Sequence, residues 1–207
     1  MDFLIWLSFL GAALLLTIMP GPDNLFVLAQ SISNGKNAGI ATAFGLCTGL
    51  IVHILATVLG VSALLYQSSL AFSIIKYAGA AYLMYLAYKA FTAKSSPLEV
   101  QKTQQVSYDA LYKKGIIMNI LNPKVSLFFL AFLPQFVTAS GGSAAFQMLV
   151  YGITFLVQAL FVFTVISLFA GKVGTVLRKR PAISQKVNLI EGSLFTLIGL
   201  RIALSEK

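Results

Sequence analysis

The sequence predicts an all-α integral membrane protein with six transmembrane helices arranged as two inverted three-helix repeats. Of its 207 residues, 58% are hydrophobic and only 10% are charged, whereas soluble domains carry about 25% charged residues. A helix that spans a bilayer needs about 20 mostly apolar residues. The apolar runs of that kind cover residues 3–33, 39–66, 70–91, 115–138, 144–171 and 187–204.

The first run is predicted to stay in the membrane. Asp2 stands where a signal peptide carries positive charge, and the run is longer than the apolar region of about 7–15 residues that such a peptide contains. It also lacks a convincing cleavage site, so we expect a transmembrane span.

The placement of positive charge predicts the topology. The net charge is +9, and loops rich in Lys and Arg remain in the cytoplasm. The second and fourth loops carry no charge, and the basic loop residues lie in the first, third and fifth: Lys36, Lys94, Lys102, Lys113, Lys114, Lys172, Arg178, Lys179, Arg180 and Lys186. Odd loops are therefore expected inside and both termini outside, and no nucleic-acid partner is expected.

A polar segment divides the chain into two halves. Residues 92–114 form the longest connection, predicted as a cytoplasmic loop between a first repeat, 1–91, and a second repeat, 115–207. Because three spans are an odd number, a duplicated half would enter the membrane in the opposite orientation, as in many secondary transporters.

Prolines predict that the first and fourth helices are broken. The first run is interrupted at Pro20, Gly21 and Pro22, and the fourth at Pro123. Proline removes a backbone donor and clashes with the preceding turn, and in lipid the freed polar groups must find other partners. A charged residue follows each break, Asp23 and Lys124, and intramembrane charges mark functional sites.

Counting along the hairpins places four polar residues at one depth. With a turn near Asn37, Asp23 lies opposite residue 51, close to His53, and with a turn near Gly141, Lys124 lies opposite Gln158. We therefore expect the four to meet near the membrane centre. Structural alternatives stay open: Asp23 as a helix-capping acid, Lys124 as its ion-pair partner or a snorkelling residue, and His53 as a hydrogen-bonded core residue.

Close helix packing is predicted around Gly45 and Gly49, whose spacing lets helices approach closely. This pair favours packing within the bundle, with a homodimer as the alternative. The lone cysteine, Cys47, is interpreted as a small core residue.

Known catalytic signatures are missing from the sequence. It contains no H-E-x-x-H, no G-x-x-x-x-G-K-[ST] and no complete G-x-S-x-G. One histidine without a Cys or acid cluster makes a metal site unexpected. The chain is therefore predicted to be no enzyme and to need no metal or other cofactor.

Two motifs resemble those of the LysE/RhtB family of amino-acid exporters. The first comprises residues 20–24 and 34–39 with Gly45, Gly49 and His53, and the second comprises residues 119–124, 128–130 and 133–136. The resemblance covers essentially the whole chain in order. It implies efflux of amino acids or close derivatives across a bacterial cytoplasmic (inner) membrane, driven by an ion gradient, without distinguishing among substrates.

The resulting hypothesis is a multi-pass secondary transporter with its site at the two breaks. Substrate binding is assigned to Asp23, Asn24, Asn119, Asn122, Lys124 and Gln158. Protonation of Asp23 or His53 would couple export to the proton gradient by alternating access. The alternatives are a metal or cation exporter, and a membrane scaffold or sensor subunit that transports nothing.

Overall fold

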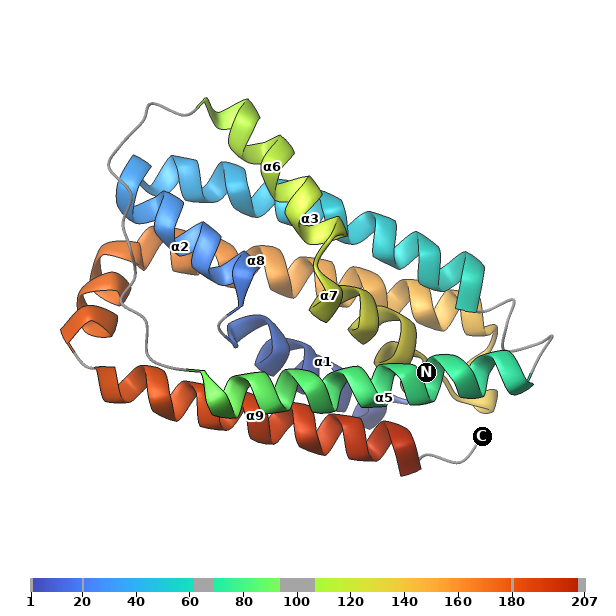
Figure 1. The fold of residues 1–207 in the computed structure, drawn as a ribbon. Coiled ribbons are helices and arrows are strands. Elements are labelled where there is room, and N and C mark those ends of the chain that lie inside the picture. The colour runs from blue at the N-terminus through green and yellow to red at the C-terminus, as the bar shows by residue number, and fades with distance from the viewer. Residues whose placement is uncertain (1, 20, 62–68, 94–106, 180, 205–207) are drawn as a thin grey trace.

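The computed structural model describes residues 2–19, 21–61, 69–93, 107–179 and 181–204, and every regular element among them is a helix (Figure 1). Pro20, the second loop apart from Ser69, and most of the third loop lie outside the described residues. The α-helices are α1 (Phe3–Ile18), α2 (Pro22–Asn34), α3 (Lys36–Ala56), α5 (Ser69–Thr92), α6 (Tyr108–Ile120), α7 (Pro123–Leu127), α8 (Ala144–Lys179) and α9 (Pro181–Leu204). Short elements follow α3 and α7, namely the π-helical η1 (Thr57–Val61) and η2 (Phe128–Phe132) and the 3₁₀ turns η3 (Leu133–Phe136) and η4 (Ala139–Gly141).

Two of the apolar segments are broken helices. The axis turns by 55° between α1 and α2, and by 48° between α6 and the segment Pro123–Phe136. Pro22 and Pro123 occupy the first turn of the new helix, where the missing N–H of proline costs nothing because that group has no helical partner. Both breaks thus fall at predicted prolines.

Two helices among the described residues, Lys36–Gly60 and Ala144–Lys172, are long and apolar enough to cross a membrane. Counting each bent pair as one span raises the number to four. The third and sixth apolar runs also form helices, α5 and α9, but they are not among these candidate spans. The six-span arrangement therefore stays a prediction.

Successive long helices reverse direction along one axis (Figure 1). The α2–α3 and α8–α9 junctions, the end of α5 and the start of α6 gather at one end of the molecule, and the start of α1 and the end of α9 lie toward the other. Lys113 and Lys114 lie midway along α6, and the junction end carries Lys36, the first residue of α3. It is the end that the positive-charge rule assigns to the cytoplasm.

Two predicted loops differ from the structure. Residues 172–179 continue α8 and residues 181–186 begin α9, so the expectation of a fifth loop over 172–186 is wrong. Lys and Arg are good helix formers and are favoured near helix C-termini, so basic residues alone do not end a helix. The predicted third loop, 92–114, also differs at its end, because α6 already begins at Tyr108. Ser107 caps this helix, and its Oγ accepts from the N–H of Ala110 at 3.2 Å.

Glycines bring α3 and α6 into backbone contact. A Cβ on Gly45 would overlap the carbonyl oxygen of Tyr112, and one on Gly49 would lie 2.8 Å from the Cβ of Asn119. A Cβ on Gly115 of α6 would lie 2.8 Å from the carbonyl oxygen of Thr42. The small-residue pair of α3 is therefore used inside the bundle, and it sets the position of Asn119.

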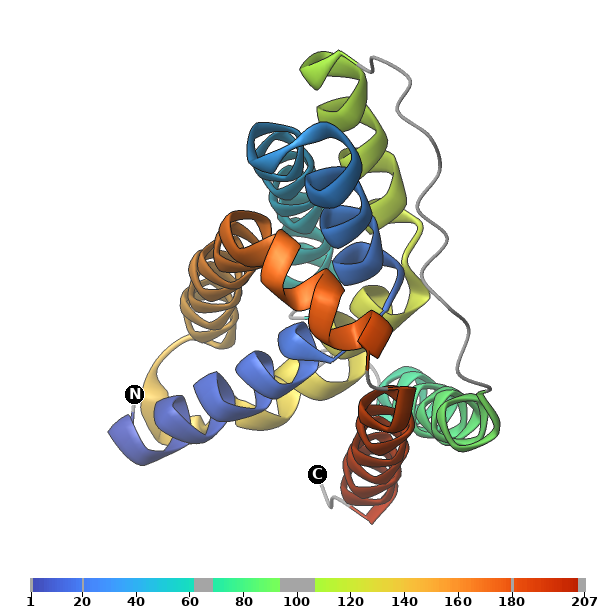
Figure 2. The same cartoon turned by 90° about the vertical axis from the view of Figure 1, so that its left-hand side faces the viewer.

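An aromatic cluster joins α1 to the second half. The ring of Phe9 lies 4.7 Å from that of Tyr151 on α8 and 5.2 Å from that of Phe136, measured between centroids. Phe128 and Phe155 extend the cluster, with centroids 4.9 Å apart. Helices α5 and α9 lie side by side as a pair (Figure 2), and both contact η2.

Replacing Gly45 by Ala is expected to lower stability, because the added methyl meets backbone rather than a flexible side chain. Such overpacking costs about 1–3 kcal/mol, so the apparent melting temperature in detergent should fall by several degrees. Gly11→Ala in α1 is the matched control, since a Cβ there meets nothing within 4 Å. Equal melting temperatures for the two variants would contradict the close α3–α6 contact.

Candidate functional site

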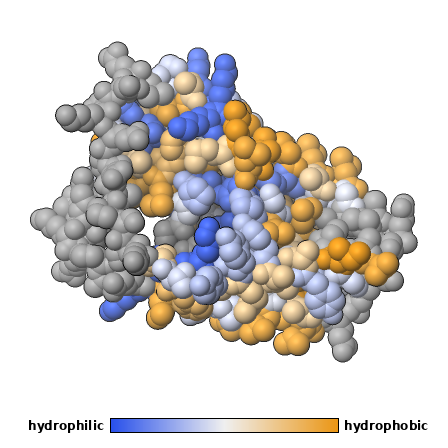
Figure 3. Space-filling model, viewed as in Figure 1, coloured by the Kyte–Doolittle hydropathy of each residue, from blue (hydrophilic) through white to orange (hydrophobic). Residues whose placement is uncertain are grey.

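The two helix breaks meet at a small cavity. Its volume is about 30 Å³, and Figure 3 shows hydrophilic residues in a hollow near the middle of one face of the molecule. Residues from α1, α2, α3, α6, α7 and α8 and from both breaks line the cavity: Leu16, Thr17, Met19, Gly21, Asp23, Asn24, Leu50, Asn119, Asn122, Lys124, Val125, Phe155, Ala159 and Phe163.

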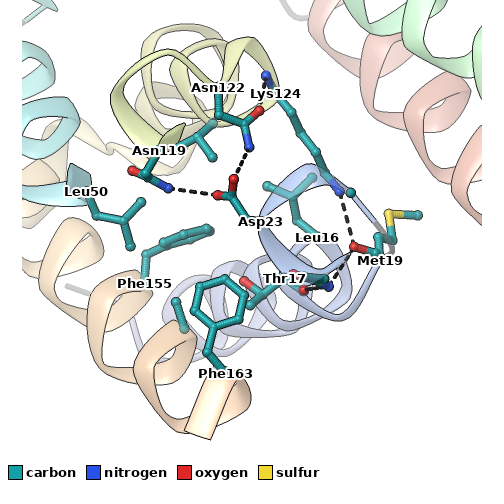
Figure 4. A pocket seen from close by; sticks show the side chains of 14 residues that line it. Leu16, Thr17, Met19, Asp23, Leu50, Asn119, Asn122, Lys124, Phe155 and Phe163 are labelled. Atoms are coloured by element: carbon teal, nitrogen blue, oxygen red, sulfur yellow. Dashed lines mark hydrogen bonds between the residues drawn. The ribbon is translucent and has the colours of Figure 1, made fainter. Parts of the chain in front are cut away.

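Asp23 is held by two amide side chains from the other half of the chain (Figure 4). Nδ2 of Asn119 donates to its Oδ2 and Nδ2 of Asn122 donates to its Oδ1, both at 2.9 Å. Asp23 is 6% exposed. It lies in the first turn of α2, where the helix dipole favours negative charge. The acid is thus buried and satisfied.

Asn122 connects the two breaks. While its Nδ2 binds Asp23, its Oδ1 accepts from the backbone N–H of Lys124 at 3.0 Å and so caps α7. A helix begins with N–H groups that lack helical partners, and an Asn cap satisfies one of them. One amide therefore ties the start of α7 to the start of α2.

The opposite problem, unpaired carbonyl groups at the end of α1, is solved by Asn24. Its Nδ2 donates to the carbonyl oxygens of Thr17 at 2.6 Å and Met19 at 2.8 Å. Lys124 adds a cation at the same place, with Nζ 3.5 Å from the carbonyl oxygen of Met19 (Figure 4). Nζ also lies 5.4 Å from the ring centroid of Phe195 on α9.

His53 lies behind Asn119 and does not line the cavity. Its Nε2 lies 3.0 Å from the backbone carbonyl oxygen of Asn119. A carbonyl oxygen only accepts, so Nε2 carries the hydrogen and any further proton binds at Nδ1. The ring stacks on Phe129 with centroids 6.0 Å apart. His53 is thus connected to Asp23 through the single residue Asn119.

Gln158 contacts the site indirectly. Its Nε2 donates to Oγ1 of Thr17 at 2.8 Å, and it does not line the cavity. Oε1 of Gln158 and Oδ1 of Asn119 are buried without a hydrogen-bond partner among the described residues. Gln158 therefore positions Thr17, which lines the cavity, and counting along the hairpin did not predict this contact.

Apolar residues of α8 line the cavity and were not predicted. Phe155, Ala159 and Phe163 recur at helical spacing and form one wall. The spacing i, i+4, i+8 is visible in the sequence, but α8 is apolar on several faces, so periodicity does not single out this one. Leu16 and Leu50, also not predicted, bring α1 and α3 into the same lining.

The described part of the lining combines one acid, one base and amide groups in apolar surroundings. Asp23 offers a carboxylate to a cation, while Lys124 and the starts of α2 and α7 favour an anion. A volume of about 30 Å³ holds one or two water molecules, and sites for small molecules usually measure about 300–1,000 Å³. Among the described residues, no three His, Cys, Asp or Glu side chains gather as metal ligands.

Comparison with known proteins supplies independent findings. The family model described as LysE type translocator matches residues 14–206. The chain is 34% identical over 203 residues to the homoserine/homoserine lactone efflux protein of Salmonella typhimurium, with 98% of both chains covered. It is 32% identical over 204 residues to an uncharacterized membrane protein of Vibrio cholerae, again with 98% of both covered. No solved structure matches the chain.

A double-mutant cycle tests the link between the two halves. Asp23→Ala and Asn122→Ala should each destabilise the protein, and the double variant should lose about 0.5–3 kcal/mol less than their sum, as contacting residues do. The measurement is thermal or denaturant unfolding in detergent. Asn34→Ala, which removes an amide bonded to Gln30, is the control and should add to Asp23→Ala within about 0.5 kcal/mol. Additivity in both cycles would contradict the bond.

Proposed function

Because the chain belongs to the LysE type translocator family, we propose that it is a secondary transporter exporting amino acids or close derivatives. The proposal places it in a bacterial cytoplasmic membrane, with six spans, two inverted halves and both termini outside. The name of the Salmonella typhimurium relative refers to efflux of homoserine and its lactone, and this supports a small amino-acid-like substrate here.

The observation that carries the proposal is that an acid from one break and a base from the other line the same cavity. In the proposed complex, the substrate ammonium group binds the carboxylate of Asp23. The substrate carboxylate binds Lys124 and the N-terminal ends of α2 and α7, whose dipoles favour anions. Asn24, Asn119 and Asn122 remain in the site as hydrogen-bonding groups, and Gln158 acts through Thr17.

Lys124 is the residue expected to change partner. Its ammonium group now lies 3.5 Å from the carbonyl oxygen of Met19, at the end of α1. A substrate carboxylate is a stronger partner than a neutral carbonyl, because ionised pairs form the stronger hydrogen bonds. Substrate binding would therefore draw Lys124 away from α1 and loosen one contact between the two breaks.

Alternating access is proposed because the cavity is too small for an amino acid. At about 30 Å³ it must widen before a substrate enters, and the breaks supply places where helices can bend. Each half consists of a broken helix, a long helix and a further helix in the same order, which supports inverted repeats. The π-helical η1 and η2 add local departures from regular helix, a feature common at functional sites.

Proton coupling is assigned to Asp23 and His53. The two are joined through Asn119, whose side chain binds the acid and whose backbone carbonyl binds the ring. An imidazole ring can carry a proton, and a proton on Asp23 would compete with the substrate ammonium group. Binding and release of substrate would then be linked to protons.

Asp23→Asn is expected to reduce amino-acid export at least tenfold in proteoliposomes with an imposed pH gradient, because the ammonium group loses its anionic partner. The assay measures transport of radiolabelled amino acid across the vesicle membrane while the pH gradient is maintained. Asp109→Asn is the matched control, since Asp109 is exposed in the first turn of α6, and it should keep wild-type rates. Undiminished, proton-dependent export by Asp23→Asn would remove Asp23 from the mechanism.

His53→Gln is expected to separate transport from coupling. A glutamine N–H can replace the donor to the Asn119 carbonyl, but it cannot accept the proton. Exchange of amino acid across the membrane without a gradient should therefore persist, while stimulation by a pH gradient should fall severalfold. Equal stimulation in the variant and the wild type would show that His53 only holds Asn119 in place.

Reconstitution also separates the alternatives. A protein that moves no amino acid in either assay would favour a scaffold or sensor subunit. Flux of a metal or other inorganic cation without amino-acid flux would favour a cation exporter.

A further inference from the structure

We propose that the face of α8 formed by Phe155, Ala159 and Phe163 binds the substrate's side chain and restricts transport to amino acids with uncharged, mainly apolar side chains. This inference rests on the proposed function and extends it. It assigns a specificity role to residues that lie apart from the charged groups of the site.

The three residues form a continuous wall of the cavity. They are one helical turn apart on α8, and all are buried. Figure 4 shows Phe155 and Phe163 on α8, on the opposite side of Asp23 from Asn122. If Asp23 and Lys124 hold the ammonium and carboxylate groups of an amino acid, its side chain extends toward the apolar part of the lining.

The charge of the lining argues against a second cation. Asp23 is the one acid among the described residues that line the cavity, and both of its oxygens already accept hydrogen bonds. The side-chain ammonium or guanidinium of a basic amino acid would find no second acid among the described lining residues, and a buried unpaired charge is costly. An aliphatic side chain instead gains by leaving water.

The size of the lining residues sets the length of side chain that fits. Ala159 is the small residue between two phenylalanines, so its methyl group leaves the space that a side chain would enter. One methylene more or less in an apolar pocket changes selectivity about 10–200-fold. A larger residue at position 159 should therefore favour shorter substrate side chains, and a smaller residue at position 163 should favour longer ones.

Phe163 is a sharper test than Phe155. Phe155 also packs against Phe128 and Phe129, with ring centroids 4.9 and 5.2 Å apart, so its loss would disturb the aromatic cluster. The variants are Phe163→Ala, which enlarges the cavity, and Ala159→Leu, which fills it. The same helix supplies controls on its exposed side, Phe161→Ala and Val157→Leu, at residues 67% and 60% exposed.

The experiment measures exchange of radiolabelled homoserine, leucine and lysine by the full-length protein in proteoliposomes. The readout is the leucine-to-homoserine rate ratio for each variant, which does not depend on how much protein folds or inserts. We expect this ratio to rise about tenfold in Phe163→Ala and to fall about tenfold in Ala159→Leu. Both controls should keep the wild-type ratio, and lysine should exchange least in the wild type.

The outcomes separate this inference from the proposed function. Amino-acid exchange by the wild type with the same ratio in all variants, or an equal shift in a control and its partner, would overturn the α8 subsite alone. Lysine exchange as fast as leucine exchange in the wild type would overturn the restriction to uncharged side chains. A wild type that exchanges no amino acid would overturn the proposed function and the inference together.

Discussion

The structure depends on the pair of hydrogen bonds that Asn119 and Asn122 donate to Asp23. An ionised carboxylate without partners inside an apolar bundle costs several kcal/mol, and hydrogen bonds to charged groups contribute about 1.5–3 kcal/mol each. Because the acid belongs to the first half and both amides to the second, satisfying this charge requires the halves to meet. The same requirement places the two helix breaks together.

Other features of the fold help to hold the two halves in contact. Gly49 allows α6 to approach α3 so closely that a Cβ would lie 2.8 Å from Asn119, and this contact holds the amide beside Asp23. The broken backbone is satisfied locally, since Asn24 binds carbonyl groups of α1 and Asn122 caps α7. Proline breaks are tolerated in such a bundle because side chains replace the lost helical hydrogen bonds.

Polar residues that interrupt apolar runs were the clearest signal in the sequence. Asp23 and Lys124 stand out because burying them is expensive, and helical counting predicted that they share a depth; both line one cavity. The same counting placed Gln158 at that depth, but its amide binds Thr17 instead of lining the cavity. The fifth loop was predicted from the gap between two apolar runs, yet the residues on either side of position 180 continue α8 and begin α9, because basic residues readily form helix.

The sequence by itself determined the class of protein, the two proline breaks and the identity of the polar residues beside them. Those properties follow from composition and from the backbone chemistry of proline, which do not depend on how the helices pack against one another. Only the tertiary structure decided which amides bind Asp23, where the ammonium group of Lys124 lies, and which face of α8 lines the cavity. Helix α8 is apolar on several faces, so its orientation follows from packing against α1, α2 and α3 rather than from its own pattern.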